Sequence, residues 1–161
     1  MSDIEKKLNA LSQINDSHLQ KCIQYIIGHF EEEISLSHLA NAVGISEWAV
    51  CRRFQVHLGV SPMKWVWCFR VHLASECIIL TPSWSLTDIS VLCGFNSLAH
   101  FSRLFKNQFD ISPTDFRAKN QVKFPTSSQL QADKYREFLF DSQLLYEQGV
   151  LDKAALAAIS S

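Results

Sequence analysis

The chain has 161 residues and a formal net charge of −1, from 15 Lys and Arg against 16 Asp and Glu. Hydrophobic residues make up 47% and charged residues 19%, which excludes a disordered chain and supplies enough apolar material for a folded core. Only 5 Gly and 4 Pro argue against a turn-rich all-β sandwich. Because the overall charge is nearly zero, any nucleic-acid binding must come from a local face.

The N-terminal part of the chain predicts an extension followed by a packing helix. Residues 1–17 are polar and contain no hydrophobic signal segment. Apolar side chains recur at helical spacing from His18 to Phe30, which predicts a helix with one buried face. The five cysteines are odd in number and include no CxxC pair, so we expect free thiols in a reducing compartment, the cytoplasm.

A short motif occurs twice in the chain. Residues 35–46 read Ser-Leu-Ser-His-Leu-Ala-Asn-Ala-Val-Gly-Ile-Ser, and residues 85–96, at an offset of 50, read Ser-Leu-Thr-Asp-Ile-Ser-Val-Leu-Cys-Gly-Phe-Asn. Further along, residues 52–54 match residues 103–105 at an offset of 51, so the second copy has one extra residue after its glycine. The repeat predicts a duplicated small module.

Each copy predicts two helices joined by a tight turn. Gly44 and Gly94 end the first helices, where the chain must adopt positive φ. Ser46 and Ser97 are expected to cap the second helices by accepting a hydrogen bond from a free backbone N–H. A helix, a glycine-containing turn and a second helix with one polar face are typical of the helix-turn-helix motif.

Helical spacing also predicts which side chains of the second helices are buried. In the first copy the buried face is predicted to contain Val50, Phe54 and His57, opposite Trp48, Arg52 and Gln55. In the second copy the buried face contains Phe101, Phe105 and Phe109, with Arg103 and Lys106 pointing away.

The segment between the repeats predicts a long linker helix over residues 62–80. Ser61 caps it, Pro62 occupies its first position, and Thr81-Pro82 follows its end. Its length of about 28 Å is compatible with two helix-turn-helix units one DNA turn, about 34 Å, apart. Its apolar arc is broad, which favours packing against both repeats, and Arg70 within that arc would need an acidic or carbonyl partner if buried.

The character of the sequence changes after Asn120. The segment 121–161 carries 4 basic and 5 acidic residues and does not match the repeat. An amphipathic helix is predicted over 129–148 and a short Ala-rich helix over 152–159. The fold class expected for the whole chain is therefore all-α, with two helix-turn-helix subdomains, a linker helix and a helical C-terminal tail.

The repeated motifs resemble the AraC/XylS family of bacterial transcription regulators over roughly residues 18–120. The matching positions are Leu39-Ala40, Gly44-Ile45-Ser46, Arg52, Phe54, Gly59, Ser61-Pro62, Arg70, Ala74, Ile89, Gly94-Phe95, Phe101 to Lys106, Phe109, Ser112-Pro113 and Phe116-Arg117. The resemblance implies a subdomain over 18–61, a linker helix over 62–80 and a subdomain over 81–120. It also implies that the second helix of each pair enters a DNA major groove.

The resemblance is closest to the short branch of that family that includes MarA, SoxS and Rob. It implies that the chain is a sequence-specific regulator and an activator that contacts RNA polymerase, binds double-stranded DNA as a monomer and has no small-molecule effector domain. The residues expected to bind DNA are Ser46, Trp48, Cys51, Arg52 and Gln55 in the first copy, and Ser97, Leu98, Ala99, Ser102, Arg103 and Lys106 in the second.

Other classes of function have little support. Cys68, His72 and Glu76 share a helix face, but three groups at i, i+4 and i+8 lie too far apart to close around one ion, so we expect no metal site. No catalytic or nucleotide-binding motif is present, so we expect neither an enzyme nor a cofactor.

One alternative stays open at the level of the sequence. Leu98 and Ala99 are apolar where this branch often has polar base-contacting residues, and residues 18–120 contain nine basic and eight acidic residues. These features are compatible with a homologue that binds DNA poorly and modulates transcription by binding a protein through the 121–161 tail. The same tail is a candidate for self-association.

Overall fold

The computed structural model describes residues 13–120, apart from the side chain of Leu80, and every regular element in that range is a helix. The all-α prediction is therefore confirmed for residues 13–120. The helices predicted in the tail and the tail's self-association lie outside the described residues. The described residues divide between Val66 and Trp67 into two compact units.

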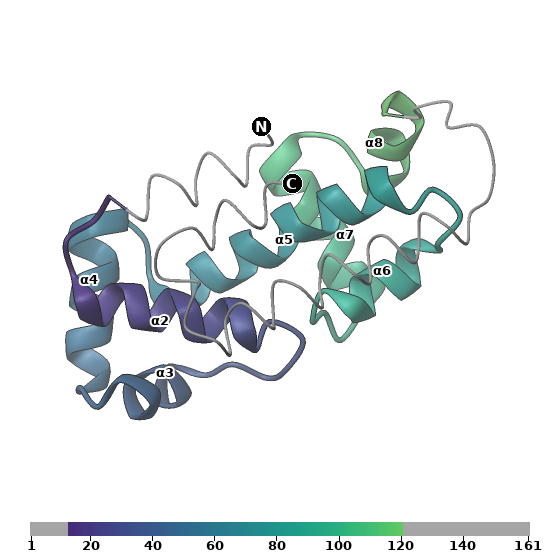
Figure 1. Cartoon of the computed structure of the whole chain (residues 1–161). Coiled ribbons are helices and arrows are strands. Elements are labelled where there is room, and N and C mark those ends of the chain that lie inside the picture. The colour runs from purple at the N-terminus through teal and green to yellow at the C-terminus, as the bar shows by residue number, and fades with distance from the viewer. Residues whose placement is uncertain (1–12, 121–161) are drawn as a thin grey trace. The chain divides into compact units, whose positions relative to one another are not determined.

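The first unit contains three helices that pack against one another, α2 (Ser17–Gly28), α3 (Leu36–Val43) and α4 (Glu47–Leu58) (Figure 1). Each begins at a capped N-terminus, where Asp16, Ser35 and Ser46 accept a hydrogen bond from the N–H three residues on. Their shared core includes the fully buried side chains Leu19, Ile26, Leu39, Val50 and Phe54. Each such side chain stabilises the fold by roughly 1.5–3 kcal/mol relative to exposure to water.

The turn between α3 and α4 has the geometry expected from the sequence. Gly44 has a φ of 75°, and its N–H donates to the carbonyl of Ala40 at 2.8 Å. Ser46 then caps α4 by accepting from the N–H of Ala49 at 3.1 Å. The first helix-turn-helix predicted from the repeat is thus present in the first unit.

Gly44→Ala should destabilise the chain by about 1–2 kcal/mol, the cost of a left-handed conformation at a residue with a Cβ atom. A Cβ atom at this position would meet no neighbour within 4 Å, so backbone strain alone produces the loss. Gly28→Ala is the matched control, because Gly28 lies in α2 and does not have positive φ. Thermal unfolding measures both changes, and equal melting temperatures for Gly44→Ala and wild type would contradict the turn.

The linker helix α5 (Pro62–Leu80) begins at the residue predicted. The Ser61 hydroxyl accepts from the N–H of Lys64 at 3.2 Å, and Pro62 occupies the first helical position. The ring of Trp65 packs on Phe54 of the first unit, and that of Trp67 packs on Phe95 of the second. The prediction that this helix contacts both repeats is confirmed.

The second unit contains residues 67–80 of α5 together with α6 (Leu86–Leu92), α7 (Leu98–Phe109) and α8 (Pro113–Lys119). A chain of ring contacts runs along the inner face of α7 through Phe101, Phe105 and Phe109, with centroids 5.6 and 4.7 Å apart. Phe116 of α8 packs on the last two of these rings. As predicted, Phe101 and Phe105 are fully buried, while Phe109 is half-buried.

The second turn differs from the first by the one residue that the repeat offset predicts. Gly94 has a φ of 86°, and the N–H of the next residue, Phe95, donates to the carbonyl of Ser90. Ser97 caps α7 through a 3.1 Å hydrogen bond from the N–H of His100. At the end of α7, Asp110 adopts the left-handed conformation with a φ of 62°, where Gly59 does so at the end of α4.

One predicted position in the core is wrong. His57 is exposed, and its ring lies beside Asp16 rather than in the core with Val50 and Phe54. Helical spacing places His57 on the same face as Val50 and Phe54, but it lies in the last turn of α4. There its ring nitrogen Nε2 lies 3.2 Å from a carboxylate oxygen of Asp16.

Candidate nucleic-acid interface

Three residues at a spacing of four form an exposed line along α4: Trp48, Arg52 and Val56. The side chains of Trp48 and Val56 are 70% and 66% exposed, although both are large and apolar. The guanidinium of Arg52 lies over the indole of Trp48, with its central carbon 5.5 Å from the ring centroid. We call these three residues the ridge.

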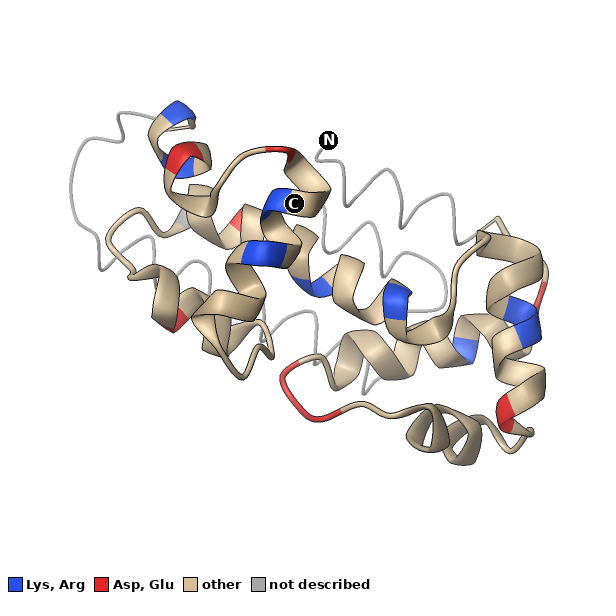
Figure 2. Cartoon of the chain, turned by 180° about the vertical axis from the view of Figure 1, so that it is seen from behind, with Lys and Arg blue, Asp and Glu red and all other residues tan. Residues whose placement is uncertain are grey.

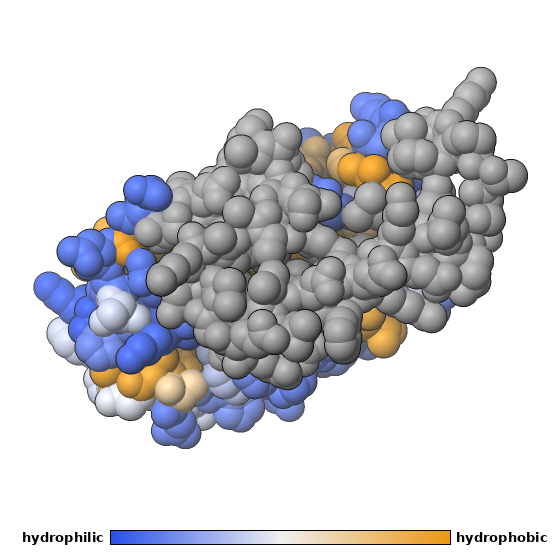
Figure 3. All heavy atoms as spheres, viewed as in Figure 1, coloured by the Kyte–Doolittle hydropathy of each residue, from blue (hydrophilic) through white to orange (hydrophobic). Residues whose placement is uncertain are grey.

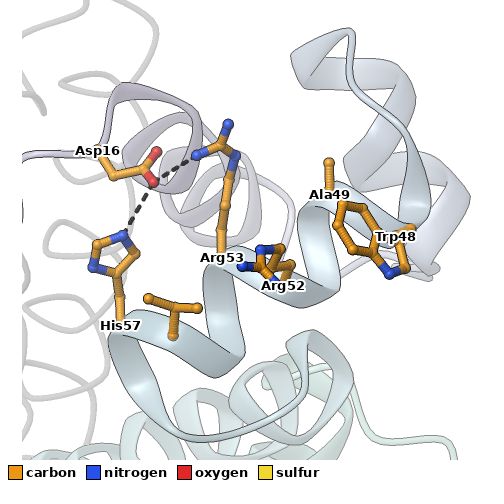
Figure 4. Close-up of a pocket in the computed structure, with 7 residues that line it drawn as sticks. Asp16, Trp48, Ala49, Arg52, Arg53 and His57 are labelled. Carbon is orange, nitrogen blue, oxygen red and sulfur yellow. Dashed lines mark hydrogen bonds and ion pairs between the residues drawn. The ribbon is translucent and has the colours of Figure 1, made fainter.

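The ridge separates two open hollows on the surface of the first unit. One, of about 380 Å³, is also lined by Asp16, Ala49, Arg53 and His57 (Figure 4). The other, of about 390 Å³, is also lined by Cys51, Gln55 and Ser61. Since all three ridge residues line both hollows, the ridge projects between them.

The first hollow contains an ion-pair cluster that joins α4 to the start of α2. One carboxylate oxygen of Asp16 accepts from Arg53 at 2.7 Å and lies 3.2 Å from the ring nitrogen Nε2 of His57. The other oxygen accepts from the N–H of Leu19 at 3.0 Å and so caps α2. Figure 4 shows Arg53 and His57 both directed at Asp16, with Trp48 and Arg52 directed elsewhere. We call Asp16, Arg53 and His57 the clasp.

The clasp changes the acidity of its carboxylate. Burial by itself raises the pKa of Asp16, but the hydrogen bond from Leu19 and the charged and hydrogen-bonding groups of Arg53 and His57 outweigh it, so the pKa is lowered from the ordinary value of 3.8. The side chain of Asp16 is only 9% exposed, so these partners replace most of its water. The clasp therefore holds an ionised carboxylate beside the C-terminal half of α4.

The sequence did not identify Asp16 or Val56 as residues of this site. Asp16 is 37 residues from Arg53 and 41 from His57, so nothing local in the sequence marked the pairing. Val56 had a usable signal, because it continues the spacing of Trp48 and Arg52 by one more helical turn.

The remaining predicted residues of the first unit lie around the ridge. Ser46 and Gln55 are exposed, whereas Cys51 is half-buried at the edge of the second hollow. Ser46 caps the helix as well as lying on its surface. The structure thus brings all five predicted residues of the first copy onto one helix and its cap.

The predicted residues of the second unit also share one helix and its cap. Ser97, Leu98, Ala99, Arg103 and Lys106 are exposed on α7, and Ser102 is half-buried. The outer face of α7 has two basic side chains but no aromatic residue comparable to Trp48. Figure 2 shows Lys and Arg residues on α4, α7 and α8, and each unit also contains Asp and Glu residues.

The buried arginine in α5 lies against an aromatic ring. The sequence predicted an acidic or carbonyl partner for Arg70, which is only 3% exposed. Its guanidinium lies over the ring of Trp67, 4.6 Å from the centroid, and burial lowers its pKa. The negative face of the ring stabilises the cation.

Cys68, His72 and Glu76 are not brought together as a metal site. No group of three metal-ligating side chains occurs within residues 13–120. The His72 ring instead packs on the edge of Phe109, and the Cys68 thiol donates to the Gln108 side chain at 3.7 Å. All five cysteines are free thiols, and no helix in the described part of the chain is long and apolar enough to cross a membrane.

Two helix pairs with glycine-containing turns and an exposed, basic second helix define a helix-turn-helix protein of the DNA-binding class. Residues 39–119 match the family model described as a helix-turn-helix domain, HTH_18, and the chain belongs to this AraC/XylS-type family. The recognition of the family from its motifs is therefore confirmed.

Similar proteins agree with this membership. The HTH-type transcriptional activator RhaS of Enterobacter sp. (strain 638) is 32% identical over 103 residues, which cover 64% of this chain and 37% of RhaS. An AraC-type regulator from Chromobacterium violaceum has a TM-score of 0.62 at 31% identity, over 66% of this chain and 95% of that one. The DNA-binding domain of AdpA, solved with a target DNA, has a TM-score of 0.61 at 25% identity, over 70% of this chain and all of that one.

The similarity covers the described domain and only part of the curated relatives. The chain matches about 37% of the length of RhaS. The predicted assignment to the short branch with MarA, SoxS and Rob is not tested by these similarities and stays a prediction.

Proposed function

We propose that the chain is a sequence-specific regulator of transcription that binds double-stranded DNA through α4 and α7, each in a major groove. The single observation that carries the proposal is the ridge, because it places an arginine and two apolar side chains on the exposed face of the second helix of a helix-turn-helix. In Figure 3, hydrophilic and hydrophobic residues lie side by side in the region where Figure 1 places α4. The AdpA domain, which is similar to this one, was solved with its target DNA.

In this proposal Arg52 reads a guanine, since a guanidinium can donate two hydrogen bonds to guanine O6 and N7. Trp48 holds that guanidinium before DNA arrives. A cation over an aromatic ring at an exposed site is worth about 0.5–1 kcal/mol, so less side-chain entropy is lost on binding. Gln55 and Cys51 border the same surface of α4. The N-terminus of α4, which Ser46 caps, is suited to binding a phosphate.

The helix α7 has a different task in the second half of the DNA site. Arg103 and Lys106 are exposed cations on its outer face and are suited to phosphate oxygens, as is the N-terminus capped by Ser97. Leu98, Ala99 and Ser102 offer small contacts to bases. Because the two helices differ, the DNA site should be asymmetric, with sharper base preference under α4.

The proposal extends to the role of the protein in the cell. RhaS, which is similar over 103 residues, is named a transcriptional activator. Activation by contact with RNA polymerase on the bacterial chromosome, in the cytoplasm, is the matching role here. One chain contains two helix-turn-helix units, so a monomer can occupy a complete site.

Selection of duplexes from a random pool by the full 161-residue chain tests this function. The expected result is a motif of two unlike halves centred about one helical turn, roughly 34 Å, apart. A pool that stays random after selection would contradict the proposal and favour the alternative, a protein-binding modulator acting through residues 121–161. A palindromic motif would contradict the unequal roles of α4 and α7.

Lys106→Ala should weaken binding to all duplexes similarly and lower the slope of log affinity against log salt by about one, because one phosphate contact is lost. Titration of a selected and a scrambled duplex at several salt concentrations measures this slope. Lys119→Ala, a charge-matched change on α8, is the control and should leave the slope unchanged. A loss of affinity confined to the selected duplex would show that Lys106 contacts a base instead.

A further inference from the structure

Val56 is an apolar side chain that the first unit leaves outside its core. It is 66% exposed, whereas Val50 and Phe54 of the same helix are fully buried. It lies one helical turn beyond Arg52 and borders both hollows, as Arg52 and Trp48 do. No feature of helix formation requires a β-branched residue here, since valine is a weaker helix former than alanine, leucine or lysine.

We propose that Val56 reads the 5-methyl group of a pyrimidine, which is thymine in unmodified DNA, about two base-pair steps from the pair that Arg52 contacts. The proposal rests on the proposed function of α4 as a recognition helix. Valine has neither donor nor acceptor in its side chain and cannot read a base edge by hydrogen bonding. The 5-methyl group of thymine is the apolar group that a base pair presents in the major groove.

The spacing along α4 suits this role. Four residues of a helix advance about 6 Å. Base pairs are stacked about 3.4 Å apart, so Val56 lies about two steps from the pair under Arg52. The expected signature is therefore a guanine followed at about two steps by a methyl-bearing pyrimidine, within the half-site under α4.

A second exposed valine supplies a contrast. Val91 of α6 is 64% exposed, nearly as much as Val56. It lies on a helix of seven residues that contains Asp88 and no Lys or Arg, so its surroundings do not attract a polyanion. Val56 follows Arg52 by one turn and lies on a second helix of the helix-turn-helix, which is why we assign the methyl contact to Val56 alone.

The test replaces thymines of the selected duplex one at a time with deoxyuridine, which removes only the methyl group. The full wild-type chain should lose about fourfold in affinity at one position in the half-site under α4, the value of one buried methyl. Val56→Ala should bind the unmodified duplex about fourfold more weakly and lose sensitivity to deoxyuridine at that position only. Val91→Ala, the matched control, should behave as wild type.

Cytosine and 5-methylcytosine at the same position distinguish the methyl group from the rest of thymine. Wild type should prefer 5-methylcytosine over cytosine by about fourfold, and Val56→Ala should not distinguish them. The inference is overturned if Val56→Ala loses affinity at the same deoxyuridine positions as wild type. It is also overturned if wild type loses no affinity at any deoxyuridine position in the half-site under α4. In both cases a retained preference for the selected duplex leaves the proposed function standing, whereas loss of all preference in wild type overturns both.

Discussion

Arg52→Ala should weaken binding to the selected duplex by about 1–3 kcal/mol and relax the base preference at one position, with a smaller effect on a scrambled duplex. The reason is that the bidentate contact with guanine exists only where that base is present, whereas the loss of charge affects every duplex. The fold should be unchanged, because Arg52 is exposed and contacts the exposed ring of Trp48. Titration of both duplexes at constant salt measures the effect.

Lys64→Ala is the matched control for Arg52→Ala. Lys64 is an exposed cation near the start of α5, off the ridge, so its removal takes the same charge from the same unit. Both duplexes should weaken alike in this variant. If Arg52→Ala also weakens both alike, Arg52 contacts phosphate and does not read a base.

Asp16→Ala should destabilise the chain by about 2–5 kcal/mol, because it removes an N-cap worth about 0.5–2 kcal/mol and a charged hydrogen-bond acceptor worth about 1.5–3 kcal/mol. Asp16→Asn should cost about 1 kcal/mol less than Asp16→Ala, since an amide oxygen still accepts from the N–H of Leu19. Urea unfolding of the three proteins measures the differences. Equal stabilities for wild type and Asp16→Asn would contradict the clasp.

The clasp also has a defined pH dependence. The pKa of Asp16 is lower in the folded chain than its ordinary value of 3.8, so folding favours the ionised carboxylate. Its stabilisation is fully present above the unfolded pKa and is lost as the pH falls through the lower folded pKa. The stability difference between wild type and Asp16→Asn should therefore shrink as the pH falls below about 4. A difference that grows as the pH falls below about 4 would show that the sign is wrong.

The local elements of the fold were predictable because their signals lie within a few residues of one another. Glycines at 44 and 94 fixed the turns, and serines at 46 and 97 fixed the helix starts. The one-residue difference between the repeats was read from the offset alone. These features depend on backbone geometry and capping, which the nearest residues decide.

The parts of the site that were missed depend on residues far apart in the sequence or on the surroundings of a buried charge. His57 was assigned to the core because helical spacing cannot show that a carboxylate 41 residues away lies beside it. The contact between Arg70 and the ring of Trp67, three residues before it, depends on the packing around a buried charge, which the sequence pattern did not show. The exposure of Trp48 was predicted from the sequence. The stacking of the Arg52 guanidinium over its ring was not, because that contact depends on the conformations of the two side chains.

The ratio of affinities for a selected and a scrambled duplex, measured with the full chain at one physiological salt concentration, tests the central claim most directly. A regulator that reads bases in two grooves should bind the selected duplex about 10³-fold more tightly or better. A ratio near one would contradict sequence-specific recognition by α4 and α7.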